Sequence, residues 1–199
     1  MFDPLVAGPV RTDQNQSRTG RFQLTENLDS AFVDLRGNAT DPNFLNTVQL
    51  AIGMSPPSSP NTYHHKDGRG LFWLGPDQWL VVMPYTQLQQ SLSDLNAARQ
   101  DTIMAFTDVS GGYTLLVAQG EQVDAFVRSG TGYDVAQLKT GVCTQTLLAN
   151  AQVTMWKPST TEYRFLVRRS YANYLYRWLM AANTRETFPT TTGTHSCPR

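Results

Sequence analysis

Short apolar runs separated by turn-forming residues dominate the hydrophobic pattern of this chain. The clearest pair, Leu71–Leu74 and Trp79–Met83, flanks Gly75-Pro76-Asp77. Glycine permits positive φ and proline fixes φ, so the residues between the two runs predict a tight turn. Each run is too short for a helix and is rich in aromatic and β-branched residues. The stretch Gly70 to Met83 therefore predicts a buried β-hairpin, around which we expect a core to form.

Further runs of the same kind predict more strands. They lie at Phe22–Leu24, Phe32–Leu35, Thr102–Asp108, Tyr113–Ala118, Val142–Leu148, Val153–Trp156 and Tyr163–Val167. Within the third run, Ile103 and Ala105 alternate with Thr102 and Met104, and alternation is typical of a half-buried strand. The Pro- and Ser-rich segment Ser55–Asn61 predicts a semi-extended connector, because proline blocks both helix and ladder.

Four segments have the apolar spacing of helices with one buried face. The first follows Asp41-Pro42, an N-cap acceptor and a proline at the first helical position, and Gly53 ends it. The second contains Leu88, Leu92 and Leu95, and the third lies between Gly120 and Gly130. Ser170 caps the fourth, whose predicted buried stripe is Tyr171, Leu175, Trp178, Leu179 and Ala182.

The order of these elements predicts an α+β fold, with sheets built from hairpins and four helices between them. It also resembles two split β-α-β units in tandem, which are duplicated β-α-β-β-type halves, although the residues of the halves barely match. We expect one domain over residues 22–183, a polar N-terminal arm over 1–21 and a flexible Thr-rich tail over 184–199. A chain of 199 residues is long enough for one sizeable core.

Charge and composition exclude several classes of partner. The chain has 16 basic and 16 acidic side chains, so neither nucleic acid nor an anionic membrane would meet a strongly positive surface. No stretch approaches the roughly 20 apolar residues of a membrane span, and the start does not resemble a secretory signal. Cys143 and Cys197 lack the spacing of a disulfide framework or a zinc site. These features predict a cytoplasmic protein without nucleic-acid or membrane partners.

Three motifs have some features of functional sites, but their residues favour ordinary structure. His64-His65 are adjacent, so their side chains point to opposite faces of an extended chain, which favours exposed loop histidines over metal ligands. The segment from Lys66 to Gly70 (Lys-Asp-Gly-Arg-Gly) lacks the spacing of a phosphate-binding loop and predicts a turn. Gly130-Thr131-Gly132 follows a helix, with Val135 in place of the third glycine, which excludes a dinucleotide fingerprint.

The sequence contains no motif that is typical of nucleophilic catalysis. There is no G-x-S-x-G motif, and the remaining histidine, His195, lies in the predicted tail. Arg168-Arg169, between a predicted strand and helix, is a tight basic pair that fits an anion, a partner's carboxylates or a solvated strand end. We therefore predict no catalytic, cofactor-binding or metal-binding residue in this chain.

Six short motifs in a fixed order resemble one known family. They are Leu35-Arg36-Gly37-Asn38, Pro60-Asn61-Thr62, Leu74-Gly75-Pro76-Asp77-Gln78-Trp79-Leu80, Thr107-Asp108-Val109-Ser110, Gly141-Val142-Cys143-Thr144-Gln145-Thr146-Leu147-Leu148, and Arg169-Ser170-Tyr171-Ala172 with Trp178-Leu179. Together they resemble the gamma subunit of heterotetrameric sarcosine oxidase, from about residue 35 to about residue 179.

The resemblance implies membership of an assembly of alpha, beta, gamma and delta chains. Such an assembly oxidatively demethylates sarcosine to glycine with oxygen, yielding hydrogen peroxide, and passes the methyl carbon to tetrahydrofolate, as 5,10-methylenetetrahydrofolate, or releases it as formaldehyde. The family places FAD and covalent FMN with beta, NAD with alpha and zinc with delta. The gamma chain is similar to the folate-binding fold of the glycine-cleavage T-protein.

One departure from the T-protein pattern bears on catalysis. In T-protein-like aminomethyltransferases, the run corresponding to Leu147–Asn150 is followed by a Gly-Gly and an acidic pair that supplies the catalytic aspartate. Here Ala151-Gln152-Val153-Thr154-Met155-Trp156 follows, without a carboxylate to stabilise an iminium-like folate. The resemblance thus implies a non-catalytic structural subunit with alpha, beta and delta partners and no cofactor of its own.

Three alternatives stay open at this point. The chain fits a subunit of a related N-methyl amino acid dehydrogenase that acts on N-methylglutamate or dimethylglycine. It also fits a stand-alone folate-binding one-carbon protein. The third alternative is an unrelated binding module that shares only the fold.

Overall fold

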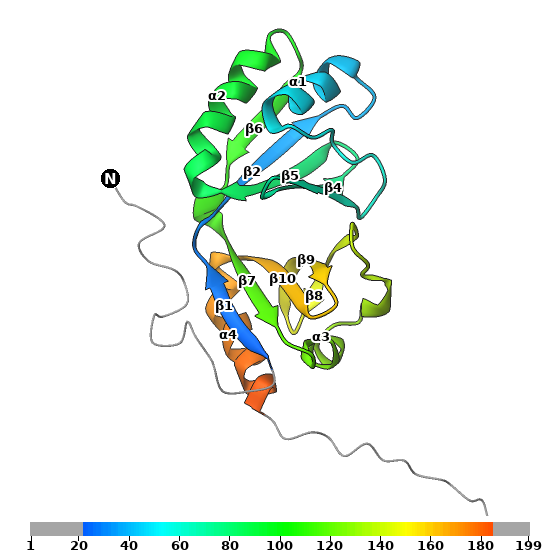
Figure 1. Cartoon of the computed structure of the whole chain (residues 1–199), viewed down its shortest axis with the longest axis vertical. Helices are drawn as coiled ribbons and strands as arrows, with labels where there is room; N and C mark the ends of the chain where they lie inside the picture. Colours follow the sequence, from blue (N-terminus) through cyan, green and yellow to red (C-terminus); the bar gives the residue numbers. More distant parts are fainter. Residues whose placement is uncertain (1–21, 185–199) are drawn as a thin grey trace, which may run out of the picture.

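The computed structural model describes residues 22–184, which form four layers (Figure 1). Two five-stranded antiparallel sheets face each other, and each has two helices on its outer side. Helices α1 (Pro42–Ile52) and α2 (Leu88–Arg99) cover the first sheet, and α3 (Val123–Gly130) and α4 (Arg169–Thr184) cover the second. The predicted α+β class, with antiparallel sheets and four helices over the described residues, is confirmed.

The first sheet is built from the N-terminal half of the described chain. Its spatial order is β3 (Tyr63–Lys66), β4 (Arg69–Gly75), β5 (Gln78–Pro84), β2 (Ser30–Gly37) and β6 (Met104–Asp108). The predicted hairpin is its β4–β5 pair, with Trp73 opposite Trp79. The Trp79 side chain is fully buried and its Nε1 donates to the carbonyl of Pro57 at 2.9 Å, which fixes the Pro-rich connector against the sheet.

The second sheet contains the first described strand of the chain. Its spatial order is β8 (Cys143–Leu148), β9 (Ala151–Ser159), β10 (Glu162–Arg168), β7 (Tyr113–Gln119) and β1 (Gln23–Asn27). The first described residues of the chain contact the last helix. Asn183 of α4 accepts a hydrogen bond from the Phe22 amide at 3.1 Å and donates one to the Phe22 carbonyl at 2.8 Å.

Helix α1 begins and ends as its sequence predicts. Asp41 accepts a hydrogen bond from the Asn43 amide at 2.9 Å, and Gly53 adopts the left-handed conformation with φ of 84°. Its buried face includes Phe44, whose ring centroid lies 5.2 Å from that of Trp79. The helix is therefore fastened to the central hairpin by aromatic packing.

Four details of the predicted pattern are wrong. Ser170 does not cap the last helix, because α4 begins at Arg169 and Ser170 lies within its first turn. Tyr63–Lys66 is strand β3 and not a loop, although His64 and His65 are exposed on it as predicted. Strand β6 begins at Met104, so Ile103 lies before it and is 90% exposed. On α4, Tyr171 is 49% exposed, because the buried stripe runs through Ala172, Leu175, Tyr176 and Leu179.

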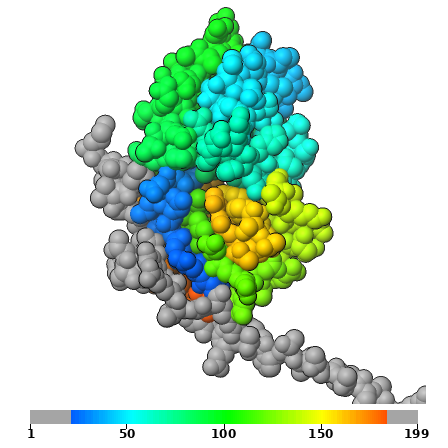
Figure 2. All heavy atoms as spheres, in the orientation of Figure 1, coloured from blue at the N-terminus to red at the C-terminus, as the bar shows by residue number. Residues whose placement is uncertain are grey.

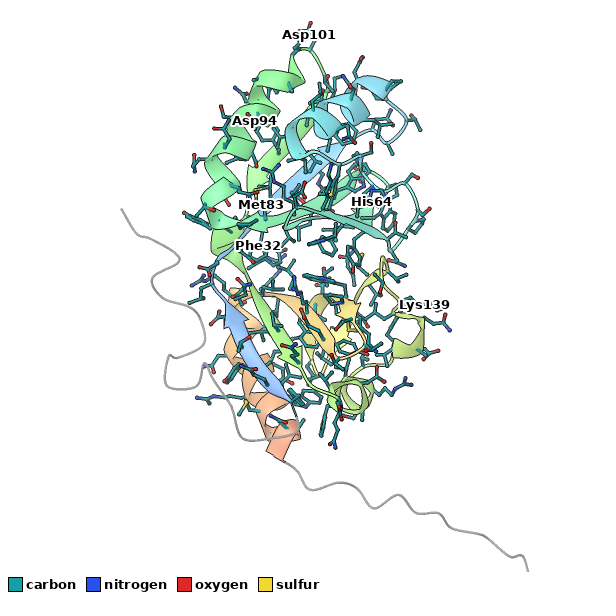
Figure 3. The ribbon with its side chains drawn as sticks, in the orientation of Figure 1. Phe32, His64, Met83, Asp94, Asp101 and Lys139 are labelled. Carbon is teal, nitrogen blue, oxygen red and sulfur yellow. The ribbon has the colours of Figure 1, made fainter. Side chains whose placement is uncertain are left out.

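A separate core fills the space between the two sheets. The ring of Phe72 lies 4.8 Å from that of Tyr63 and 4.5 Å from that of Trp156, which belongs to the opposite sheet. Phe32 lies at the same junction (Figure 3). In the space-filling view, the two halves meet in direct contact along this junction (Figure 2). The other buried members are Leu80, Val82, Leu115, Cys143 and Leu166.

Backbone hydrogen bonds join the sheets on one side of this core, and the chain itself joins them on another. At one side, the Tyr63 amide donates to Gly141 and the Cys143 amide donates to Asn61, both at 2.9 Å. At the other side the chain itself crosses from β6 through the turn at Ser110–Gly112 to β7, and just before the crossing the Val109 amide donates to the Phe32 carbonyl of β2 at 2.9 Å. The two sheets therefore form one packed unit.

The Phe44 ring lies where a side chain on Gly37 would extend. We expect Gly37→Ala to lower the free energy of unfolding by about 1–3 kcal/mol, because a methyl group there overlaps a fully buried ring. Urea denaturation followed by tryptophan fluorescence measures this change. Gly112→Ala is the matched control, because a methyl group at Gly112 meets open space. Equal stability of the two variants would contradict the packing argument.

Candidate functional site

A cavity of about 590 Å³ lies between the two sheets, beside the aromatic core. This volume is in the range of small-molecule sites in proteins, roughly 300–1,000 Å³. Both sheets and the 3₁₀ turn η3 (Ser110–Gly112) contribute to its walls. The lining residues with polar side chains are Asp34, Gln78, Tyr113, Gln145, Gln152, Thr154 and Arg168.

The wall formed by the first sheet carries the carboxylate of the cavity. Asp34 lies on β2 and accepts a hydrogen bond from Gln78 Nε2 at 2.5 Å. Its second oxygen accepts from Arg36 Nε at 3.3 Å. Strands β2 and β5 bring these groups together, because Arg36 is directly opposite Gln78 in their register. The charge of Asp34 is thus balanced within its own sheet.

The polar side chains that the second sheet contributes to the cavity wall are uncharged, except for Arg168. Gln145 on β8 lies opposite Thr154 on β9, and its amide donates across to the Leu74 carbonyl at 2.8 Å. Arg168 ends β10, and its guanidinium carbon lies 5.5 Å from the centre of the Tyr113 ring. This distance is that of a cation–π contact.

The histidines and glycine motifs weighed from the sequence lie away from this cavity. His64 is exposed on the edge strand β3, where its Nδ1 is 2.9 Å from the Ser55 carbonyl (Figure 3). Asp67 and Gly68 form the predicted turn between β3 and β4, with φ of 50° and 77°. Gly130 ends α3 beneath Trp178. His195 and Cys197 lie outside the described residues.

Of the basic pair, only Arg168 lines the cavity, since Arg169 begins α4. Burial raises the pKa of the Cys143 thiol to about 12, so it is protonated at neutral pH and is a poor nucleophile or ligand. Sequence reasoning missed Asp34 and Gln145. The available signal for Asp34 was a charged residue in the middle of an apolar strand.

The described residues 22–184 hold no group of three or more potential His, Cys, Asp or Glu metal ligands. Within the same range, no helix has the length and hydrophobicity needed to cross a bilayer.

A family model described as the sarcosine oxidase, gamma subunit family, matches residues 36–185. This chain belongs to that family. A relative, the sarcosine oxidase subunit gamma of Corynebacterium sp. (strain U-96), is 26% identical over 117 residues. That alignment covers 58% of this chain and 56% of the relative, so it spans little more than half of either protein.

Solved structures show the fold that the family membership implies. A chain of the heterotetrameric sarcosine oxidase from Corynebacterium sp. U-96, in complex with pyrrole 2-carboxylate, superimposes with a TM-score of 0.79 at 20% identity, covering 94% of this chain and 99% of that one. The glycine cleavage system aminomethyltransferase T from Bartonella henselae gives 0.59 at 12% identity, covering 84% and 46%. The predicted family and T-protein-like fold are confirmed.

A second polar cluster joins helix α3 to the second sheet. Asp124 on α3 accepts hydrogen bonds from Lys157 Nζ at 2.7 Å, Tyr163 Oη at 2.5 Å and Arg128 Nε at 2.8 Å. Burial opposes ionisation of this carboxyl, but the three hydrogen bonds outweigh it and hold the pKa of Asp124 well below its usual value of 3.8. Because the donors stabilise the carboxylate, the cluster is a structural contact.

We expect Asp124→Asn to lower the free energy of unfolding at neutral pH by about 1–3 kcal/mol. A lowered pKa in the folded state contributes stability above the unfolded pKa, and this contribution is lost as pH falls below about 4. The difference between wild type and variant should therefore shrink from about pH 5 to about pH 2. Urea denaturation across this range measures it.

Asp101→Asn is the control for this prediction, because Asp101 is exposed at the far tip of α2 (Figure 3). Its free energy of unfolding should follow that of wild type at each pH. A constant difference between wild type and Asp124→Asn at every pH would show that the Asp124 charge does not stabilise the fold.

Proposed function

We propose that this chain is a non-catalytic structural gamma subunit of a heterotetrameric sarcosine oxidase in the cytoplasm. Its partners are the alpha, beta and delta chains, which carry FAD, FMN, NAD, zinc and tetrahydrofolate. The assembly oxidatively demethylates sarcosine to glycine, yielding hydrogen peroxide and formaldehyde or 5,10-methylenetetrahydrofolate. The observation that carries the proposal is family membership, together with a fold match over 94% of this chain.

The cavity wall supports a non-catalytic role. Gln152 and Thr154, which belong to the segment where the T-protein pattern implies an acidic pair, both line the cavity. An amide and a hydroxyl are neutral at physiological pH and provide no negative charge for a cationic intermediate. Asp34 belongs to the opposite wall, and Arg36 and Gln78 already hold its carboxylate.

We also propose that the fold arose by duplication of β-α-β-β-type halves. The elements β2-α1-β3-β4-β5-α2 and β7-α3-β8-β9-β10-α4 follow the same order. The sheet orders β3-β4-β5-β2-β6 and β8-β9-β10-β7-β1 match position by position. Strand β1 thereby occupies in the second sheet the place that β6 occupies in the first, and this equivalence supports the duplication.

A second candidate function is that of a stand-alone folate-binding one-carbon protein. The volume of the cavity and the fold match to an aminomethyltransferase favour it. A subunit of an N-methylglutamate or dimethylglycine dehydrogenase would have the same structural role, with a different substrate for the assembly.

Co-purification separates these functions. We expect the affinity-tagged full chain, expressed with the other three chains of its assembly, to elute as one heterotetramer with flavin absorbance and sarcosine-dependent hydrogen peroxide production. The same tagged chain expressed alone should elute without flavin absorbance.

Turnover of tetrahydrofolate by the chain alone, above a blank without protein, would instead favour the one-carbon protein. Failure to co-elute with the other chains would contradict the subunit role. If the assembly oxidised N-methylglutamate or dimethylglycine in place of sarcosine, the chain would be a subunit of a related dehydrogenase.

A further inference from the structure

We propose that the cavity between the sheets binds a small organic monocarboxylate, with Arg168 and Thr154 holding its carboxylate. This inference concerns a ligand site of this chain itself and goes beyond its role as a subunit.

Three polar side chains of the cavity are engaged with neighbouring protein groups. Gln78 Nε2 donates to Asp34, and the second oxygen of Asp34 accepts from Arg36. Gln145 Nε2 donates to the Leu74 carbonyl. These contacts hold the first wall in place and join it to the second. The groups that make them are therefore less available to bind a ligand.

The remaining polar side chains can all donate hydrogen bonds, and among them Arg168 can only donate. Arg168 is exposed at the cavity and packs over the Tyr113 ring, and within residues 22–184 no carboxylate lies within ion-pair distance of it. The Thr154 hydroxyl has no hydrogen-bond partner among these residues, and the exposed Gln152 amide has none either. A guanidinium with unused N–H groups and a hydroxyl on the neighbouring strand of the same cavity wall suit a carboxylate.

Two further features restrict the chemical class of the ligand. A dianion is disfavoured, because Arg168 is the one cationic side chain among the described residues that line the cavity, and Arg36 is already the ion-pair partner of Asp34 on the opposite wall. The apolar part of the lining, Leu74, Leu80, Val109, Val153 and Leu166, disfavours a small hydrated inorganic anion. A monoanion with an apolar or planar body satisfies both restrictions.

The expected ligand therefore carries one carboxylate on a hydrophobic body that lies between Leu80 and Leu166. The cation–π contact with Tyr113 orients the guanidinium plane and lowers the entropy lost when it pairs with the anion. Benzoate is a suitable probe, and benzamide is its uncharged isostere.

Titration of the isotope-labelled full chain, followed by NMR, tests this site. We expect benzoate to cause saturable chemical-shift changes confined to the cavity residues of β9 and β10, and benzamide to cause none at the same concentrations. Arg168→Gln should weaken benzoate binding about tenfold or more, because a charge-assisted hydrogen bond is lost. Arg177→Gln, which removes an exposed arginine from α4 outside the cavity, should bind as wild type does.

Thr154→Val provides a second variant that preserves side-chain volume. It should fold, as its spectrum will show, and bind benzoate more weakly than wild type. Unchanged affinity in both Arg168→Gln and Thr154→Val would overturn the proposal. Equal shifts with benzamide, or shifts that do not saturate, would also overturn it, because they would show that binding does not depend on the carboxylate or is not specific. Because the isolated chain is used, neither result depends on its role as a subunit.

Discussion

The packing of the two sheets against each other is the contact on which the rest of this structure depends. Phe72 stands at its centre, between Tyr63 of its own sheet and Trp156 of the other. Aromatic pairs at such distances contribute both buried area and a preferred geometry. They hold the inner faces together along part of the junction, and the cavity lies where the inner residues are smaller or polar. The location of the candidate site thus follows from where the aromatic packing ends.

The outer face of each sheet is also apolar and must be covered. The helices supply this cover through two separate cores, one including Phe44 and Trp79 and the other including Phe165 and Leu175. Charged groups add local contacts such as the Asp124 cluster, which fastens α3 to β9 and β10. A surface with few charges and several exposed large apolar side chains, among them Leu50 and Leu147, is consistent with the proposed subunit role.

Local signals were sufficient for most of the fold. Neighbouring residues alone determine the Gly-Pro-Asp turn between the two tryptophans, and the same is true of the ends of α1 at Asp41 and Gly53. Both features are as predicted. Strand β3 was missed because only Tyr63 faces a core, so its edge position leaves no alternating pattern. The α4 stripe was misplaced because Tyr176 is buried although tyrosine is common at surfaces, whereas Tyr171 is exposed. The cavity was beyond sequence reasoning, since Asp34, Gln145 and Arg168 meet only through the pairing of distant strands.

The hydrogen bonds between Asn183 and Phe22 have a consequence for chain connectivity. Strand β1 completes a sheet whose other four strands are about ninety or more residues later in the sequence, so β1 cannot pair before β7 is available, and its contact with Asn183 requires α4 as well. A circular permutant that places β1 after α4 through a short linker would retain the same contacts. Each half would then be contiguous in sequence, and folding would require fewer long-range encounters.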